Sequence, residues 1–423
     1  MDTQQILSVA VFICALGLIV SEKVHRALVA LVGAVLLIVL NVIPFEDAMM
    51  ALDFNTLGVL FGMMLFVAVV KLSGIFEFLA IKCAHLAKGD PWKIMVLFVL
   101  LTAVLSAFLD NVTTVLLIGP MTITICSMLN VNPVQFFIAE IMASNIGGTA
   151  TLIGDPPNIM IGSAAGFDFA DFIVYDAPVV VVILAVIIVL FYFMYGRKMT
   201  VEHADVEKVL DLNARDYIKD PRLLKISVVM IGLVVMGFML HGALGLESSV
   251  IALGAAGIIL LVSRESIDHA LSNVEWTTLV FFAGLFIIVG GMEETGVINM
   301  LALWLIDVTG GDVFVTMIVL VFASAVISSF LDNIPFVATM LPILLSMEAS
   351  GMDVAPLWWA VSLGACLGGN GSLIGASANV VLSDISKKNG HPITFAQFTK
   401  VGFPVMMLTV VIAALYLVIR FPA

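Results

Sequence analysis

Runs of about 20 mostly apolar residues recur along the whole chain, and no other feature limits the fold as strongly. A helix needs about that length to cross the hydrocarbon core of a bilayer, where no water is available to pair a free backbone group. Of the 423 residues, 62% are hydrophobic and only 12% are charged, whereas an ordinary soluble domain has about 25% charged residues. The sequence therefore predicts an all-α polytopic membrane protein.

The first apolar run, Ile6 to Val20, has no basic residue before it and no A-x-A cleavage site after it. These features indicate a retained helix rather than a secretory signal. The net charge of −13 is carried mostly by acids in short polar loops, which is typical of a solvated surface. The 4 cysteines have no C-x-x-C spacing, so neither a disulfide framework nor a zinc site is predicted.

Several sequence blocks of the first half return about 222 residues later in the same order. The segment SAFLDNV at 106–112 returns as SSFLDNI at 328–334, and GGTATLIG at 147–154 returns as GGNGSLIG at 368–375. Upstream of these blocks, glycines also align between the halves: Gly62 and Gly74 with Gly284 and Gly296. Separate blocks in one register indicate an internal duplication.

Each half contains five apolar spans, a pair of apolar segments that meet at an Asp-Asn tip, and a glycine-rich interruption. No Lys or Arg flanks the tips, so each pair is interpreted as a re-entrant hairpin that enters and leaves on one side. Five crossings per half would invert the second repeat relative to the first. The predicted fold is two inverted-topology repeats, each with five transmembrane helices, a re-entrant hairpin and a broken helix. The expected boundaries are 1–196 for the first repeat (hairpin 93–130, broken helix 134–165), 197–223 for a polar linker, and 224–423 for the second repeat (hairpin 313–350, broken helix 356–386).

The distribution of basic residues predicts the orientation. Loops rich in Lys and Arg stay in the cytoplasm. If the linker is cytoplasmic, all of the 18 Lys and Arg residues except Arg420 fall on that side. We therefore predict a protein of the plasma or inner membrane with an extracytoplasmic N-terminus and a cytoplasmic linker.

The glycine-rich segments predict a binding site built from main chain. Unpaired backbone at membrane depth persists only inside protein or around a wet cavity. Pro156 and Pro157 lack the helical donor and break the first helix, whereas the second break rests on its glycines alone. Four helix ends would then meet near the bilayer midplane, where N-termini attract anions and freed carbonyls bind cations.

Polar residues of both repeats are predicted to line this substrate- and ion-binding site. They are Asp110, Asn111, Thr113, Thr114, Asn145, Gly148, Thr149, Thr151, Asp155, Asn158, Asp332, Asn333, Gly369, Asn370, Ser372, Ser377 and Asn379. A charge at the bilayer centre costs about 2.5–3.5 kcal/mol or more, so Asp110, Asp155 and Asp332 are the first candidates for coupling to protons or sodium. The alternative interpretation is that these aspartates cap the following helices, and both roles can coexist. Glu140 is a weaker candidate.

No Lys, Arg or His is expected in the site. An anionic substrate would then be held by helix ends, hydroxyls, amides and a co-bound cation. Cys126 and Cys366 are interpreted as packing residues rather than as ligands of a metalloid. We predict no catalytic residue, and no cofactor apart from bound sodium ions.

Two motifs resemble a known family. FLDNVTTVLLIGP at 108–120 and AEIMASNIGGTATLIGDPPNIMI at 139–161 resemble the signature of the ArsB and melanosomal P-protein branch of the ion transporter superfamily. The resemblance implies a homodimer in which a scaffold part carries a moving transport part with both hairpins and both broken helices. Members of the family move arsenite or antimonite, dicarboxylates or citrate, or exchange sodium for protons.

By this resemblance, one sodium site would involve Asp110, Asn111, Thr113 and Thr149 with the Gly147–Thr151 loop. A pseudo-symmetric site would involve Asp332, Asn333 and Asn370 with the Gly368–Ser372 loop. The second repeat departs from the pattern, because Thr113-Thr114 becomes Pro335-Phe336 and DPPN becomes ASAN at 376–379. An equivalent second ion site is therefore in doubt.

The leading functional hypothesis is an ion-coupled secondary transporter for a small anion or metalloid oxyacid, working by alternating access. The alternatives are a sodium/proton antiporter without an organic substrate and a passive anion channel. An intramembrane aspartyl protease is disfavoured, because Ile153-Gly154-Asp155 lacks the first glycine of G-x-G-D and Tyr175-Asp176 is expected at a membrane edge. The chain is therefore not expected to be an enzyme. Its expected partners are a small-molecule or inorganic ion substrate and the lipid bilayer, with no nucleic acid. Because no G-x-x-x-x-G-K-[ST] loop occurs, any use of ATP would need a separate ATPase subunit.

Overall fold

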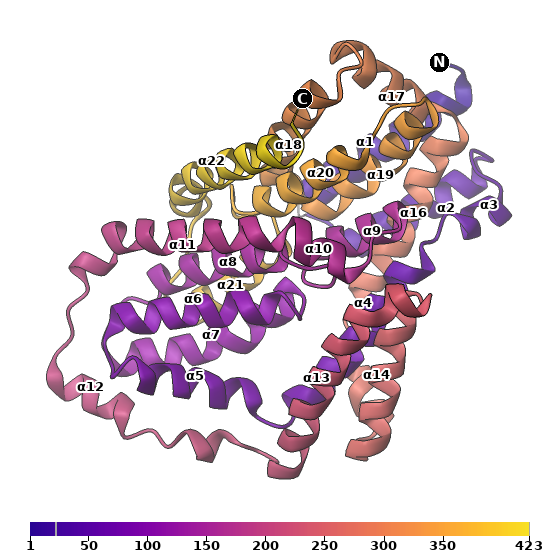
Figure 1. Cartoon of the computed structure of the whole chain (residues 1–423). Coiled ribbons are helices and arrows are strands. Elements are labelled where there is room, and N and C mark those ends of the chain that lie inside the picture. The colour runs from indigo at the N-terminus through magenta and orange to yellow at the C-terminus, as the bar shows by residue number, and fades with distance from the viewer. Residues whose placement is uncertain (22, 423) are drawn as a thin grey trace.

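The computed structural model describes residues 1–21 and 23–422. These residues form helices joined by short turns, without any strand (Figure 1). The all-α fold class that the sequence predicts is therefore confirmed.

The first repeat contains helices α1 to α11. Their bounds are α1 (Thr3–Val20), α2 (Arg26–Val39), α3 (Phe45–Met50), α4 (Phe54–Lys71), α5 (Ile75–Leu86), α6 (Pro91–Ser106), α7 (Asn111–Met128), α8 (Val134–Gly148), α9 (Pro156–Ala165), α10 (Phe169–Tyr175) and α11 (Ala177–Met194). The α6–α7 pair is the first hairpin, and α8 and α9 are the two arms of the first broken helix.

The linker and the second repeat follow. The linker carries α12 (His203–Leu210) and passes around the edge of the molecule from α11 to α13 (Figure 1). The later helices are α13 (Pro221–Leu244), α14 (Ser248–Ser263), α15 (Ile267–Ser272), α16 (Trp276–Glu294), α17 (Val297–Val308), α18 (Val313–Phe330), α19 (Asn333–Ala349), α20 (Ala355–Gly368), α21 (Ser377–Lys388) and α22 (Phe395–Arg420). The α18–α19 pair is the second hairpin, and α20 and α21 form the second broken helix.

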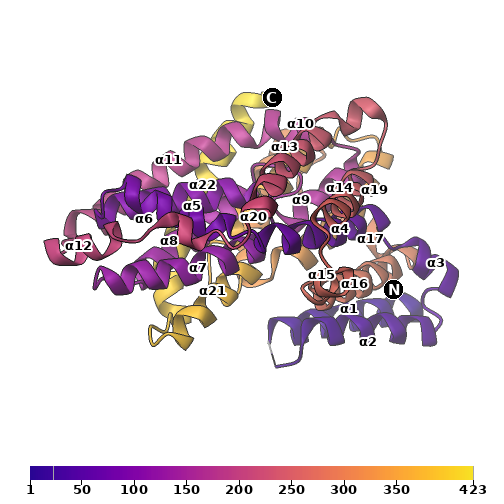
Figure 2. The same cartoon turned by 90° about the horizontal axis from the view of Figure 1, so that it is seen from below.

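The two repeats interlock reciprocally, as inverted copies should. We call α1, α2, α4, α13, α14 and α16 the column helices, since several of them run steeply at the right of Figure 1. Within this group α4 of the first repeat packs on α14 of the second, and α16 of the second packs on α2 of the first. We call α6–α9 and α18–α21 the hairpin helices, and of these α6–α8 and α21 lie to one side of the column helices in both views (Figures 1 and 2). Among them α7 packs on α21 and α19 packs on α9.

Repeated glycines explain the close packing. A methyl group added to Gly62 of α4 would lie 2.6 Å from the carbonyl carbon of Ala252, and one added to Gly284 of α16 would lie 2.6 Å from that of Ala30. Small residues let membrane helices approach this closely. The other aligned pair, Gly74 and Gly296, has positive φ angles of 79° and 74° and precedes the short helices α5 and α17. These helices lie outside the spans expected from the sequence.

The outer surface matches a lipid environment. Eight of the described helices are long and apolar enough to cross a membrane by length and composition. Several of them expose large apolar side chains, such as Val229 on α13, which is 62% exposed. Leu261 on α14 is 81% exposed. Apolar surface on this scale is costly in water, so the chain is an integral membrane protein.

Candidate functional site

Each broken helix is interrupted by a loop that a single asparagine holds closed. In the first loop, residues 149–155, the Asn158 Nδ2 donates to the carbonyls of Thr149 at 3.1 Å and Thr151 at 3.0 Å. In the second loop, residues 369–376, the Asn379 Nδ2 donates to the carbonyls of Gly369 at 2.7 Å and Ser372 at 2.9 Å. Both asparagines are fully buried. They satisfy carbonyls that the helix break would otherwise leave unpaired in an apolar interior.

Hydroxyl groups tie both loops to the adjacent hairpins. The Thr151 hydroxyl donates to the carbonyl of Ala107 just before the first tip. The Ser372 hydroxyl donates to the carbonyl of Ser329 just before the second tip. Each loop is therefore fixed to the hairpin of its own repeat, and the repeats use the same device.

The first hairpin tip is satisfied mainly within its own repeat. Asp110 caps α7, accepting from the Thr113 N–H at 2.8 Å and from the Thr113 hydroxyl at 2.5 Å. The Asn111 side-chain oxygen accepts from the Ser106 hydroxyl at 2.5 Å, and the Asn111 main-chain carbonyl accepts from the Ser144 hydroxyl at 3.2 Å. The capping role proposed as an alternative for Asp110 is thus present in the structure.

Buried amides join the two repeats at the centre. The Asn145 Nδ2 donates to the side-chain oxygens of Asn370 and Asn379, each at 3.0 Å. The Asn333 Nδ2 donates to the Asp155 Oδ2 at 3.1 Å. All five side chains are at most 4% exposed. The two repeats therefore share one polar interior, which belongs to neither repeat alone.

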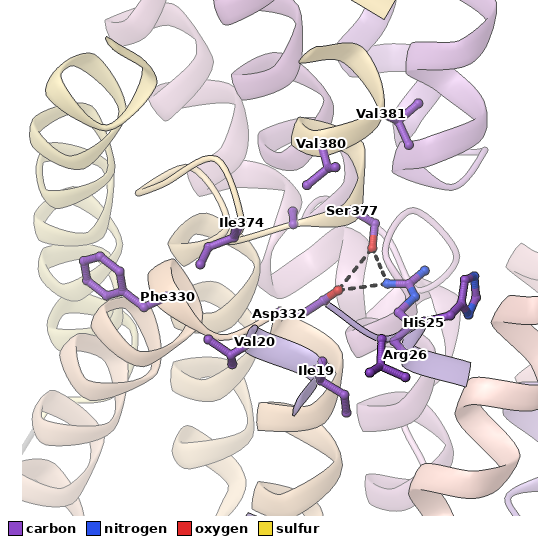
Figure 3. Close-up of a pocket in the computed structure, with 12 residues that line it drawn as sticks. Ile19, Val20, His25, Arg26, Phe330, Asp332, Ile374, Ser377, Val380 and Val381 are labelled. Carbon is purple, nitrogen blue, oxygen red and sulfur yellow. Dashed lines mark hydrogen bonds and ion pairs between the residues drawn. The ribbon is translucent and has the colours of Figure 1, made fainter. Parts of the chain in front are cut away.

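The second hairpin tip contains an arginine, which the sequence analysis did not expect. Arg26, the first residue of α2, places its Nη1 atom 2.9 Å from the Asp332 Oδ2 and 2.5 Å from the Ser377 Oγ (Figure 3). The Ser377 hydroxyl also lies 3.1 Å from the Asp332 Oδ2. The expectation that the site contains no basic side chain is wrong. Arg26 follows a turn at the beginning of an apolar span, and its neighbours in sequence do not indicate which way it points.

Two cavities adjoin the tips. One of about 40 Å³ lies between them and is lined by both repeats, including Asp110, Asp155, Glu275, Asn333 and Ala376. The other, of about 290 Å³, lies beside Arg26 and Asp332 and is otherwise mostly apolar, with Phe330 and Val381 in its wall (Figure 3). Arg26 contributes to the lining of both.

The structure brings the predicted site residues of the two repeats into one region. Gly148 lies against the Asn111 side chain, and Gly369 lies near Ala376 at the end of its own loop. Thr114 is buried, and its hydroxyl has no hydrogen-bond partner among the described residues. Asp155 stands at the N-cap position of α9 without capping it and accepts from Asn333 instead. Glu140 lies away from the tips, where it accepts from the Thr122 hydroxyl at 2.6 Å.

Two further polar residues were missed. Asp176 was expected at a membrane edge but is fully buried, 2.6 Å from the Ser362 hydroxyl. That hydroxyl also lies 2.8 Å from the Asn158 Oδ1 atom. An aspartate in front of an Ala-Pro pair resembles an ordinary helix start, and nothing in the local sequence points to Ser362.

Paired, inverted repeats whose hairpin tips and broken helices share one polar interior define a class of protein, the secondary transporters. A family profile described as "Citrate transporter", CitMHS, matches residues 16–364. The chain belongs to the CitMHS citrate transporter family, within the ion transporter superfamily.

Named relatives agree with this placement. An uncharacterized transporter of Mycobacterium tuberculosis is 42% identical over 423 residues, covering 98% of both chains. The human P protein is 33% identical over 503 residues, covering 99% of this chain and 60% of the P protein. The resemblance to the P-protein branch is thus confirmed. The crystal structure of the YdaH transporter of Alcanivorax borkumensis matches with a TM-score of 0.60 and 15% identity over 99% of each chain, which shows the shared fold.

Proposed function

We propose that this transporter moves a small anion or metalloid oxyacid, such as arsenite, antimonite or citrate, by alternating access and in exchange or symport with protons or sodium. The observation that carries this proposal is the asymmetry of the two tips. Asp332 already has a cation, Arg26, at 2.9 Å. Asp110 makes no ion pair among the described residues.

The cation site is proposed at the first tip, with Asp110, Asn111 and Thr149 as its ligands. A monovalent cation would be the positively charged partner that Asp110 lacks. It would bind carbonyl and carboxylate oxygens, and the loop at 149–155 offers ligands of this kind. A second sodium ion was expected near Asp332, Asn333 and Asn370, but Arg26 already pairs with Asp332, Asn333 bonds Asp155, and Asn370 accepts from Asn145. The proposal therefore assigns one exchangeable cation to each chain instead of two.

Reconstitution tests this proposal. Purified protein in liposomes should accumulate radiolabelled citrate or arsenite only when a sodium or proton gradient is imposed. Asp110→Asn should abolish the dependence on the gradient, and it should leave the protein folded because Asn is as good an N-cap as Asp. Gradient-dependent uptake that survives in Asp110→Asn would refute the proposed cation site.

A sodium/proton antiporter without an organic substrate is the second candidate. The cavity between the tips supports it, because about 40 Å³ accommodates roughly one water-sized ligand and no carboxylate of the size of citrate. Liposomes loaded with a pH-sensitive dye distinguish the two, since an antiporter moves protons after a sodium pulse with no anion present. Single-channel currents in planar bilayers would instead indicate a passive anion channel.

We propose a homodimer in the plasma or inner membrane, with the N-terminus outside and the linker inside. Light scattering of the detergent-solubilised protein measures the mass of the assembly. A membrane-impermeant thiol reagent on intact cells should fail to label Asp211→Cys in the linker and should label Glu247→Cys. Uptake by liposomes without ATP would exclude the need for an ATPase subunit.

A further inference from the structure

Asp176 is a buried carboxyl that does not perform the usual task of its position. It stands at the N-cap of α11, yet it makes no side-chain cap hydrogen bond. The second residue of α11 is Pro178, which has no N–H to offer. The carboxyl turns instead toward α20, where its Oδ2 atom lies 2.6 Å from the Ser362 Oγ.

Ser362 connects Asp176 to the loop of the first broken helix. The Asn158 Nδ2 donates to loop carbonyls, and these bonds fix the orientation of the side-chain amide. The Asn158 Oδ1 atom therefore faces α20 and lies 2.8 Å from the Ser362 Oγ. The thiol of Cys366 donates to the same Oδ1 atom at 3.4 Å. A chain of contacts thus runs from Asp176 through Ser362 and Asn158 to the carbonyls of residues 149–151.

If Asp176 is ionised, the contacts from Asp176 through Ser362 to Asn158 have one hydrogen too few. The Ser362 hydroxyl has one hydrogen but lies within hydrogen-bond distance of two acceptors, the Asn158 Oδ1 and the Asp176 Oδ2. With an ionised Asp176, one of the two contacts would join two oxygens with no hydrogen between them. With a protonated Asp176, the carboxyl donates to Ser362 and Ser362 donates to Asn158, so both contacts are satisfied.

The other carboxyl oxygen leads to the same conclusion. The Asp176 Oδ1 atom is buried and has no hydrogen-bond partner among the described residues. A buried ionised carboxylate with one bare oxygen is far more costly than a neutral carboxyl. No ion pair compensates it within the described chain.

The ionisable neighbours of Asp176 come from three elements. They are Tyr175 beside it, Cys366 on α20, and Tyr416 and Arg420 on α22. Arg420 is the cation among them, and its guanidinium stacks on the Tyr175 ring, 4.6 Å from the ring centre. It does not pair with Asp176, so it does not replace the missing proton.

We infer that Asp176 is a proton-binding site, whose proton at neutral pH holds the loop of the first broken helix through Ser362 and Asn158. The inference rests on the hydrogen-bond geometry and does not require the proposed substrate or cation site. Loss of this proton would remove one hydrogen bond of the chain and loosen the segment that contains Thr149 and Thr151.

Infrared spectroscopy of the reconstituted protein tests this inference. The difference spectrum of wild type minus Asp176→Asn at neutral pH should contain the carbonyl stretch of a protonated carboxyl. Asp211→Asn, which alters an exposed carboxylate of the linker, should remove only carboxylate bands. If Asp176→Asn likewise removes only carboxylate bands, the inference is overturned.

A second variant keeps the test decisive if Asp176→Asn does not fold. Ser362→Ala removes the acceptor of the proton but leaves the carboxyl in place. The protonated carboxyl band should remain in this variant and shift to higher frequency, because the hydrogen bond is lost. An unshifted band in Ser362→Ala would show that the protonated carboxyls of this protein do not include Asp176.

Discussion

The two hairpin tips have the same Leu-Asp-Asn sequence, but their aspartates bond different kinds of partner. Asp110 is held by the N–H and the hydroxyl of Thr113, three residues further along the same hairpin. Asp332 keeps only a 3.3 Å contact with the Ile334 N–H and bonds Arg26 and Ser377 from other helices. A repeated motif therefore does not ensure a repeated site.

One substitution between the repeats accounts for this difference. The residue that corresponds to Thr113 is Pro335, which has neither an N–H nor a hydroxyl. Asp332 consequently lacks both capping donors and turns to Arg26, which lies 306 residues away in the sequence. The position that corresponds to Arg26 in the second repeat is Ser248, so Asp110 has no equivalent cation. The asymmetry supports our proposal of an exchangeable cation at the first tip.

Removal of the charge at the first tip should have the largest effect. Asp110→Asn should weaken cation binding by about 10- to 100-fold, since a contact to a charged group contributes about 1.5–3 kcal/mol. Sodium titration of the thermal unfolding midpoint measures the affinity without knowledge of the substrate. Asp211→Asn in the linker is the control. An equal loss in both variants would mean that the effect is one of net charge.

Removal of the cation at the second tip should come next. Arg26→Ala leaves Asp332 partly buried and unpaired, which should cost about 1–2 kcal/mol of unfolding free energy, between the values for exposed and fully buried ion pairs. Lys23→Ala, a change of an exposed cation three residues earlier, should cost little. Adding Asp332→Asn to Arg26→Ala should recover most of the loss in a denaturation series. If the double variant is as unstable as Arg26→Ala, then Arg26 acts through packing on Phe281 and not through Asp332.

Making the second tip resemble the first should have a smaller, opposite effect. Pro335→Thr offers Asp332 the donors that Thr113 provides to Asp110. In the Arg26→Ala background it should restore about 1 kcal/mol, the usual value of an N-cap bond. The same change in the wild-type chain should add less, because Arg26 already satisfies Asp332. Equal gains in both backgrounds would show that the cap and the ion pair act independently, which would contradict our explanation of the asymmetry.

Weakening the cap at the first tip should have the smallest effect. Thr113→Ala removes the hydroxyl and keeps the N–H, so the unfolding free energy should fall by about 0.5–1 kcal/mol. Thr124→Ala removes an exposed hydroxyl that bonds its own helix, and the unfolding free energy of this variant should fall by less. A drop of several kcal/mol in Thr113→Ala would show that the hydroxyl supports more than the cap.

Much of the fold follows from the sequence because its causes are local. Apolar runs of spanning length, Pro156 and Pro157 at the first break, and Asp110 at the start of α7 act through neighbours a few residues away. The internal duplication extended these predictions to the second repeat, where Gly284 allows the same close helix packing as Gly62 does in the first. Asn158 and Asn379 could be singled out for the same reason, because each bonds carbonyls within its own broken helix.

The sequence by itself determined a membrane protein with two copies of a hairpin and a broken helix, and it marked the aspartates and asparagines at their ends. Only the tertiary structure decided which charges meet. Arg26 reaches Asp332, and Ser362 reaches Asp176 across 186 residues, because helices of different repeats pack side by side. The partner of a buried charge depends on this packing and leaves no periodic signal in either segment.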